Sequence, residues 1–469
     1  MNGVEELQAA FRDTSDFVSH PIQIGDDCVT LLYLNSLVDQ TFANEHIGQN
    51  IHPLPGEGGP ILTPLPDLQE AITAILSGNI VVFFENSSAA YVSNGGGSEN
   101  RTIQAAENES IIRGPRDSFV ESLHVNLSLI RRRFPDIGLK VQTSILGRRS
   151  KTKVALVFVD DIVNPTILQE VQSRLATVDI DEVLDCGTIE QWIQDSWYSP
   201  FPQAQYTELP VRVVSAIGEG RVAIFVDGSP SVLIVPMTFS MLFQAPDDYF
   251  ERWLIGSAIR TIRFLGAVIA LILPSLYIAL VSFHPGMIPT QLTLSIAATR
   301  AQVPFPSILE ALMMETTLEM LREAGMRLPK VMGQTIGIVG GLVIGQSAVE
   351  AGIVSPVMVI VVGITAISSF LVPAYNGAIA LRLLRFPLMI LAGTLGLFGV
   401  ILGILTVAAH LISLKSFGIN YFSPFAPYRP SDWKDIIIRA PLTNQKERPE
   451  ILHPLDRVRM NLRKRKKGW

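Results

Sequence analysis

The sequence predicts a two-part α/β region followed by an α-helical integral membrane domain with about four spans and an acidic amphipathic helix. The chain has 469 residues and is 48% hydrophobic but only 17% charged, which is too apolar for an ordinary soluble protein. Apolar runs of about 18 or more residues are typical of membrane spans. Four stretches in the second half lack Asp, Glu, Lys and Arg: 264–299, 331–349, 351–381 and 386–414.

These observations divide the chain into four parts. We predict two α/β subdomains, a helical transmembrane domain and a polar, basic tail, with boundaries at 1–147, 148–250, 251–414 and 415–469. The first residues lack the basic and apolar sections of a secretory signal. We therefore expect the leading polar region to stay on the cytoplasmic side.

Short apolar runs predict the strands of the first subdomain. VTLLYL at 29–34 and IVVFF at 80–84 have the length of single strands. The glycine-rich stretch and the polar residues that follow it, 94–110, are typical of a loop. We expect a helix from Asp117 to about Arg133.

The second subdomain is predicted to begin with a strand at 153–159, KVALVFV, and a helix from Pro165 to about Thr177. The segment 211–236 predicts a meander of three strands, VRVVSAI, RVAIFVD and SVLIV, separated by glycine-containing turns.

The polar region shows no pattern of an enzyme. It contains no phosphate-binding glycine loop, no dinucleotide-binding fingerprint and no nucleophile elbow. We interpret Asp160-Asp161 as exposed turn residues, and the seven histidines are scattered. We therefore predict no catalytic residue, no metal, no cofactor and no nucleic acid.

The first predicted span is Phe264–Phe283, and Arg252, Arg260 and Arg263 before it are typical of the cytoplasmic side. Pro274 within it indicates either a kink at a pore or simple packing.

Further spans are predicted at 331–349, 353–372 and 386–414. The basic block near the C-terminus favours contact with anionic lipid on the cytoplasmic face. An even number of spans then places Arg382 and Arg385 on the outer side of the membrane, whereas basic residues are usually enriched on the cytoplasmic side. Either the helix at 331–349 is re-entrant or these arginines pair within the bundle.

An acidic amphipathic helix lies between the first two spans. Ser307 and Glu310 have the spacing of a capping box that would begin it. Three carboxylates every fourth residue share one face of that helix. They either line a cation vestibule or face water at the membrane interface. These residues are Glu315, Glu319 and Glu323.

The next helix carries a rib of glycines, which allows close packing between membrane helices. The rib consists of Gly333, Gly337, Gly341 and Gly345. The opposite side combines apolar and polar residues and is the candidate for a pore and its gate. It consists of Val339, Val343, Gln346, Ser347 and Glu350.

Long strings around these helices resemble the A subunit of GerA-type spore germinant receptors. They are RAQVPFPSILEALMMETTLEMLREAGMRLPK at 300–330 and GQTIGIVGGLVIGQSAVEAGIVSP at 333–356. The resemblance continues through TSILGRRSKTKVALVFVDDI, GRVAIFVDGSP, APDDYFERW and PSLYIALVSFHPGMIPTQL, and into SFGINYFSPFAPYRPSDWKD. It covers nearly the whole chain beyond the first hundred residues.

The resemblance implies a role in bacterial endospores. It implies location in the inner spore membrane beside a transporter-like B subunit and a lipoprotein C subunit. A subunits of this family are thought to form a homo-oligomer that conducts ions. We therefore expect a nutrient-gated channel that releases monovalent cations to start germination.

Three alternatives stay open. A paralogous spore-membrane subunit, thought to amplify ion release without sensing nutrients, shares most of these motifs. A secondary transporter component would predict inverted repeats with paired broken helices, and the sequence has no second copy of the glycine-ribbed hairpin. A structural or signalling scaffold would not need polar groups within an apolar stripe.

Overall fold

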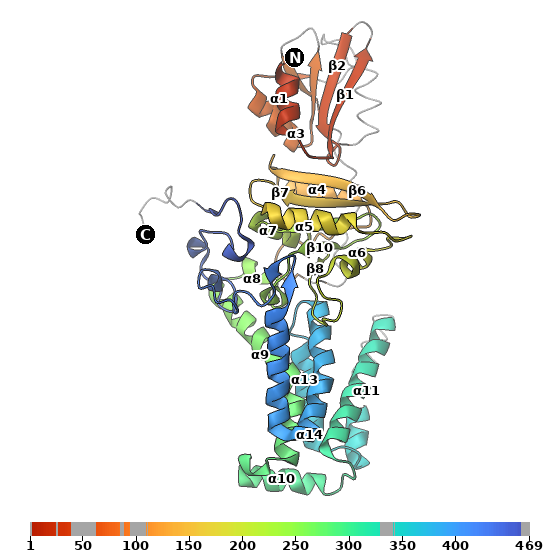
Figure 1. Cartoon of the computed structure of the whole chain (residues 1–469), viewed down its shortest axis with the longest axis vertical. Helices are drawn as coiled ribbons and strands as arrows, with labels where there is room; N and C mark the ends of the chain where they lie inside the picture. The colour runs from red at the N-terminus through yellow and green to blue at the C-terminus, as the bar shows by residue number, and fades with distance from the viewer. Residues whose placement is uncertain are drawn as a thin grey trace.

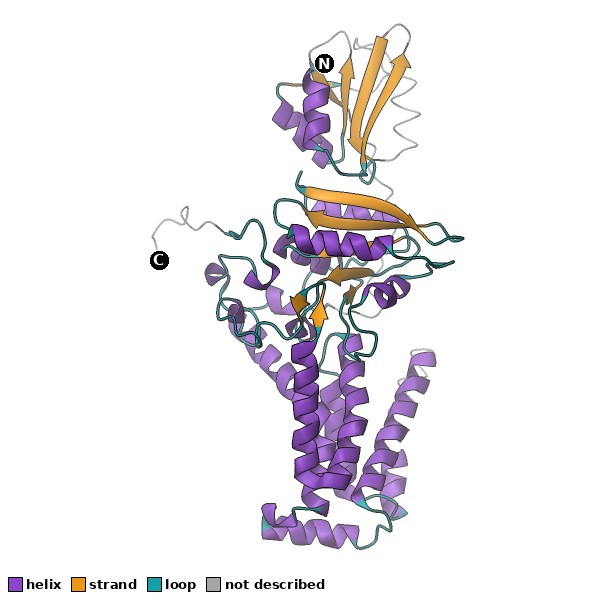
Figure 2. Cartoon of the chain, in the orientation of Figure 1, coloured by secondary structure: helices purple, strands orange, loops and turns teal. Residues whose placement is uncertain are grey.

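The computed structural model describes residues 2–24, 27–38, 62–84, 89–93, 109, 111–328, 341 and 343–460. Two sheets with their helices lie above a bundle of helices, and the chain returns from the bundle to the second sheet (Figure 1). Strands belong to the upper part and long helices to the lower part (Figure 2). The predicted order of polar region and helical domain is therefore present.

The first part is an antiparallel sheet of strand order β1-β2-β4-β5-β3. Helices α1 and α3 pack on one of its faces through a core that includes Leu7, Ile75 and Val81. The strands predicted at 29–34 and 80–84 are both present. The elements are α1 (Asn2–Ala10), β1 (Phe17–Ile24), β2 (Asp27–Leu34), β3 (Thr63–Leu65), α3 (Leu68–Leu76), β4 (Ile80–Phe84) and β5 (Ala90–Ser93). The predicted loop at 94–110 lies outside the described residues except for residue 109.

The second part is an antiparallel sheet of order β6-β7-β9-β10-β8 with helices on both faces. Because successive strand residues point to opposite faces, Leu156 and Phe158 pack with α5 and α6, whereas Val157 and Val159 pack with α4 and α7. Its elements are α4 (Leu123–Arg133), β6 (Leu139–Leu146), β7 (Thr152–Val159), α5 (Pro165–Ala176), α6 (Cys186–Ile193), β8 (Gln205–Thr207), α7 (Pro210–Glu219), β9 (Val222–Val226) and β10 (Val232–Val235).

Three predictions for this region differ from the structure. VRVVSAI is not a strand but most of α7, because Pro210 begins a helix and Val213, Ala216 and Ile217 have helical spacing toward the core. The division expected near Gly147 falls inside the β6–β7 hairpin, so the boundary between the two sheets lies before β6. The helix expected from Asp117 begins at Leu123.

A buried ion pair joins the two sheets. Nη2 of Arg131 in α4 lies 2.8 Å from Oδ1 of Asp16, which precedes β1, and the two side chains are 1% and 6% exposed. Ser36 also donates to Asp16 at 2.8 Å. The carboxylate therefore has several partners, as a buried charge requires.

Below the second sheet lies the helical bundle. Helix α9 continues through Pro274 and descends from the polar region, and α10 crosses beneath the bundle (Figure 1). The elements are η2 (Phe239–Leu242), α8 (Asp247–Phe250), α9 (Trp253–Ser282), η3 (Pro285–Met287), α10 (Thr290–Arg300), α11 (Ser307–Arg327), α13 (Pro356–Ser369) and α14 (Tyr375–Ser413).

Helix α14 consists of two antiparallel arms that meet at Gly396. This residue has φ 62° and ψ −140°, a conformation that only glycine adopts readily. In the second arm, Gly399 and Gly403 pack directly on Leu391 and Leu388 of the first arm. A Cβ atom at Gly396 would lie 2.9 Å from Cβ of Phe283, at the end of α9. The hairpin is therefore closed by glycine contacts and held against α9 at its turn.

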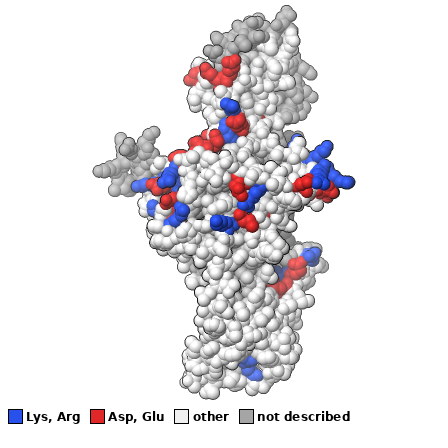
Figure 3. All heavy atoms as spheres, in the orientation of Figure 1, with Lys and Arg blue, Asp and Glu red and all other residues white. Residues whose placement is uncertain are grey.

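The four predicted spans are not confirmed. Among the described residues, two helical stretches are long and apolar enough to cross a membrane, Trp253–Phe283 and Tyr375–Ser413, of which the second includes the turn at Gly396, and α13 is apolar but shorter. The single span expected at 386–414 is wrong, because the chain turns back at Gly396. Most of the span predicted at 331–349 lies outside the described residues. Charged side chains gather above the bundle on the face drawn in Figure 3, and the bundle surface there is mostly uncharged.

The tail packs on the second sheet instead of extending away from it. Phe417, Ile451 and Leu452 belong to the core between that sheet and α5. Ser416 donates to the Gln203 carbonyl at 2.7 Å. The tail elements are β11 (Lys415–Ser416), β12 (Ile419–Asn420), η4 (Asp432–Lys434), η5 (Leu442–Asn444) and η6 (Glu450–Leu452). Of the basic block expected to contact lipid, Arg457 and Arg459 belong to the packed tail, where their backbone bonds Arg448 and Lys446, and 463–467 lies outside the described residues.

Candidate functional site

Each of the three glutamates on the acidic face of α11 forms an ion pair with an arginine. Glu315 forms an ion pair with Arg385 of α14, and both side chains are 1% exposed. Glu319 lies 2.8 Å from Arg322 Nη1 and is 31% exposed. The third pair lies nearer the end of the helix and is exposed, with Arg327 Nη2 2.6 Å from Glu323 Oε1. The three predicted vestibule residues therefore differ in burial, and only Glu319 and Glu323 contact solvent.

The Glu315–Arg385 pair is incompletely satisfied. Oε1 of Glu315 and both Nε and Nη2 of Arg385 are buried without a hydrogen-bond partner among the described residues. The nearest additional charge is Glu319, whose Oε1 lies 4.0 Å from Arg385 Nη2. Arg382 also approaches Glu319, at 3.9 Å. Of the two explanations left open for Arg382 and Arg385, pairing within the bundle is confirmed.

Glu310 is a second buried carboxylate, and it does not form the predicted capping box. Helix α11 has no side-chain cap, and Ser307 Oγ lies 2.5 Å from Ser282 Oγ of α9. Glu310 accepts from the amide and hydroxyl of Ser355 at 3.0 and 2.8 Å, and it lies 3.5 Å from Arg300. Tertiary partners compete for both side chains, so Glu310 joins α11 to the start of α13 instead.

The glycine rib is only partly described. Gly333 and Gly337 lie outside the described residues. Among the described residues, a Cβ atom at Gly341 would have no neighbour within 4 Å, and one at Gly345 would lie 3.5 Å from Val359 of α13. Within one chain, therefore, the Gly341 side is open. Its packing against another helix stays a prediction.

The candidate pore side is also open. Val339 lies outside the described residues, and Val343 is 51% exposed. Gln346 donates to Glu350 at 2.9 Å, one helical turn away. Ser347 is exposed. These positions form an exposed apolar–polar stripe in the single chain, and their role in conduction stays a prediction.

Sequence reasoning missed a charged cluster where the bundle meets the polar region, here called the head cluster: Asp248, Arg260, Arg263, Asp435 and Arg439. Asp248 lies 3.1 Å from Arg260 Nε and 2.7 Å from Arg263 Nη1. Arg260 Nη1 lies 2.9 Å from Asp435 Oδ1, and its side chain is fully buried.

The head cluster ties the tail to α8 and α9. Arg439 Nη1 donates to the Asp248 carbonyl at 2.6 Å, and Tyr249 donates to Asp435 at 2.8 Å. Burial raises the pKa of the Tyr249 hydroxyl, so it stays protonated and remains a donor. Arg260 therefore pairs inside the protein instead of marking a surface. The acidic residues of this cluster are visible in the sequence, Asp248 in APDDYFERW and Asp435 in PSDWKD, but neither string shows that the two segments come together in the fold.

No group of three or more His, Cys, Asp and Glu side chains that could hold a metal occurs within the described ranges. Asp160 and Asp161 follow β7 and are exposed.

These features define a class of protein in which a polar region of two antiparallel sheets is fixed to an apolar helical bundle with buried ion pairs. The family model described as "Bacillus/Clostridium GerA spore germination protein" matches residues 5–451. The chain belongs to this GerA family of spore germination proteins.

Relatives agree with this assignment. The spore germination protein GerLA of Bacillus cereus is 46% identical over 394 residues, which are 84% of this chain and 80% of that protein. The uncharacterized membrane protein YfkQ of Bacillus subtilis is 45% identical over 382 residues, which are 81% of this chain and 74% of that protein. A crystal structure of the N-terminal domain of the A subunit of the Bacillus megaterium spore germinant receptor GerK3 matches with TM-score 0.37 and 24% identity, covering 50% of this chain and 94% of that one. The assignment rests on the sequence matches.

Proposed function

We propose that this chain is the A-type subunit of a nutrient-gated germinant receptor and that it oligomerises in the inner spore membrane into a channel for monovalent cations. The observation that carries the proposal is the exposed stripe around Val343, beside the open Gly341 position, in a GerA-family chain. An apolar helix face with polar positions at regular spacing needs a partner, and in a symmetric oligomer it repeats as rings around one axis.

The positions of the polar region and the tail support placing both on the same side of the membrane. Helix α9 leaves the polar region, the second arm of α14 returns to it, and His410 near the end of that arm lies 2.8 Å from Ser199 (Figure 1). The tail then packs on the second sheet. In the proposed topology, the polar region and the tail both face the spore core.

The proposed partners are a transporter-like B subunit, which binds the nutrient, and a lipoprotein C subunit. The decisive experiment is cation flux through the purified chain in liposomes, with and without these partners. We expect nutrient-dependent release of monovalent cations only when the partners are present. A complete set of subunits that binds nutrient but carries no cation flux would refute the channel.

Assembly provides a second test. Gly341→Leu should abolish the oligomer on a native gel, because a large side chain prevents the close backbone approach that small residues allow. In the part of the chain that the structure describes, a side chain at 341 contacts no other residue, so the fold should persist. Helical content by circular dichroism checks this point. An unchanged oligomer would show that the glycine rib is not an interface.

The vestibule provides a third test. Glu319→Gln with Glu323→Gln removes two partly exposed carboxylates and leaves the buried Glu315–Arg385 pair intact. Single-channel conductance for monovalent cations should fall by about twofold at 10 mM salt and change little at 1 M, since the Debye length shortens from about 30 to about 3 Å. An equal loss at both salt concentrations would exclude an electrostatic vestibule.

A further inference from the structure

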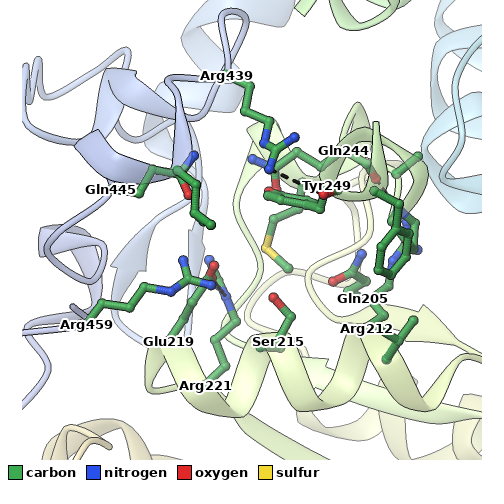
Figure 4. Close-up of a pocket in the computed structure, with 17 residues that line it drawn as sticks. Gln205, Arg212, Ser215, Glu219, Arg221, Gln244, Tyr249, Arg439, Gln445 and Arg459 are labelled. Carbon is green, nitrogen blue, oxygen red and sulfur yellow. Dashed lines mark hydrogen bonds and ion pairs between the residues drawn. The ribbon is translucent and has the colours of Figure 1, made fainter. Parts of the chain in front are cut away.

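A cavity of about 300 Å³ lies between α7, the segment 241–250 and the tail (Figure 4). Its volume is at the lower end of the range for small-molecule sites. None of the predicted pore or vestibule residues lines it. It adjoins the head cluster, because Tyr249 and Arg439 belong to its wall.

The wall of the cavity is cationic. Four arginines line it, Arg212, Arg221, Arg439 and Arg459, against one carboxylate, Glu219. Arg212 lies 2.6 Å from Glu109, and Arg221 Nε lies 3.6 Å from Glu219.

The other two arginines have no carboxylate partner within 4.0 Å among the described residues. Arg439 donates only to main-chain carbonyls, those of Asp248, Tyr249 and Glu251. The side chain of Arg459 is exposed at the mouth of the cavity. The Nε donor of Arg439 and the Arg459 guanidinium, which also attracts the Glu219 carboxylate, therefore remain available to an anion.

Buried donors within the wall are also unused. Nε of Arg439 and Nε of Arg221 are buried and have no hydrogen-bond partner among the described residues, and these side chains are 6% and 4% exposed. A buried donor without an acceptor costs about 1–3 kcal/mol, more when the group is charged. An oxyanion in the cavity would supply acceptors that the protein lacks.

The remaining wall combines four polar side chains, Gln205, Ser215, Gln244 and Gln445, with an apolar and aromatic surface. Met241, Pro246, Phe250 and Leu442 line it together with the Tyr249 ring, over which the Arg439 guanidinium lies at 5.1 Å. Figure 4 shows Arg439 reaching the cavity from the tail opposite Ser215 of α7, whereas Arg459 from the tail lies beside Glu219. A ligand that fits these surfaces has a charged oxyanion group and an apolar body.

We propose that this cavity binds a small organic anion whose carboxylate or phosphate is held by Arg439 and Arg459 and whose apolar body lies against Tyr249 and Phe250. Such a ligand would bridge the tail, α7 and α8 at the top of α9. The site is separate from the stripe around Val343, so its occupancy regulates or stabilises the bundle from the polar side.

The test uses the purified full chain in detergent and isothermal titration calorimetry with benzoate, phenyl phosphate and neutral benzamide at constant ionic strength. We expect saturable binding of at least one anion and at least tenfold weaker binding of benzamide, because the hydrogen bonds from a guanidinium to an anion are charge-assisted and those to a neutral amide oxygen are weaker. The anion that binds more tightly identifies the oxyanion as a carboxylate or a phosphate.

Two matched variants locate the site. Arg459→Gln should weaken the binding of that anion by about tenfold, and Arg457→Gln, which removes an exposed charge two residues away and outside the cavity wall, should change it by less than about twofold. Among the described residues, the Arg459 side chain makes no hydrogen bond and only a longer-range attraction to Glu219, so its loss leaves the fold intact. Absence of saturable binding of both anions, or equal effects of the two variants, would overturn the proposal.

Discussion

Replacing Glu315 with alanine is expected to destabilise the helical bundle by about 3–5 kcal/mol, because it leaves Arg385 as a buried, uncompensated charge. Arg385 is 1% exposed and contacts no other carboxylate closer than Glu319 at 4.0 Å. The change should lower the midpoint of thermal unfolding in detergent, followed by circular dichroism at the helix band.

The matched control is Glu323→Ala, which removes the same residue type two turns further along α11. Its partner Arg327 is 78% exposed, so its loss should cost at most about 1 kcal/mol. The double variant Glu315→Leu with Arg385→Met should recover most of the stability, because it removes both charges. Equal effects of Glu315→Ala and Glu323→Ala would show that the pair does not hold α11 against α14.

Val343→Ala is expected to make the proposed channel leak without nutrient. A ring of valines closes a pore by excluding water, and smaller side chains weaken that barrier. A barrier lowered by about 1.4 kcal/mol gives a tenfold faster leak. The measurement is cation release from liposomes that contain all receptor subunits, with no nutrient added. Val343→Phe should instead block nutrient-triggered release while assembly persists.

Because Val343 is exposed in the single chain, the effects of Val343→Ala and Val343→Phe can be assigned to the channel and not to misfolding. Its side chain is 51% exposed in the single chain, so neither truncation nor enlargement disturbs a packed core. Ile344→Ala is the matched control, since Ile344 is 38% exposed on a different side of the helix. Wild-type behaviour of both Val343 variants would move the search for the gate to Pro274 in α9.

Elements of the fold could be predicted from the sequence where the local pattern agrees with the tertiary environment. The strands at 29–34, 80–84 and 153–159 are short, mostly apolar runs and lie largely buried in the two sheets. Helix α5 has Pro165 at its start and Asn164 as a cap, both of which are local signals. Family membership was also predictable, because the quoted strings are long and cover most of the chain.

Other elements could not be predicted because the deciding partner is distant in sequence. VRVVSAI has a β-branched composition typical of a strand, but Pro210 and a core on one side favour α7. Ser307 and Glu310 have capping-box spacing, yet Ser282 and Ser355 bind them. Periodicity describes a single helix and says nothing about which residues of another helix it meets.

The site was partly predictable for the same reason. The charged face of α11 follows from spacing, but its neutralisation by Arg385 depends on how α11 and α14 pack. The anion cavity combines α7, the segment before α9 and the tail. Long-range contacts of this kind leave no periodic pattern.

The hairpin of α14 gives the bundle a fulcrum. Its turn at Gly396 packs closely on Phe283 and His284, so the end of the bundle farthest from the polar region is fixed at one point. The opposite ends of α9 and α14 adjoin the polar region, through the head cluster and through His410. A tilt of about 5° around that fulcrum displaces a point about 30 Å away by roughly 2.6 Å, a typical hinge movement. Because displacement grows with distance from the fulcrum, a shift of the tail moves the ends of α9 and α14 beside the polar region most and the turn at Gly396 least.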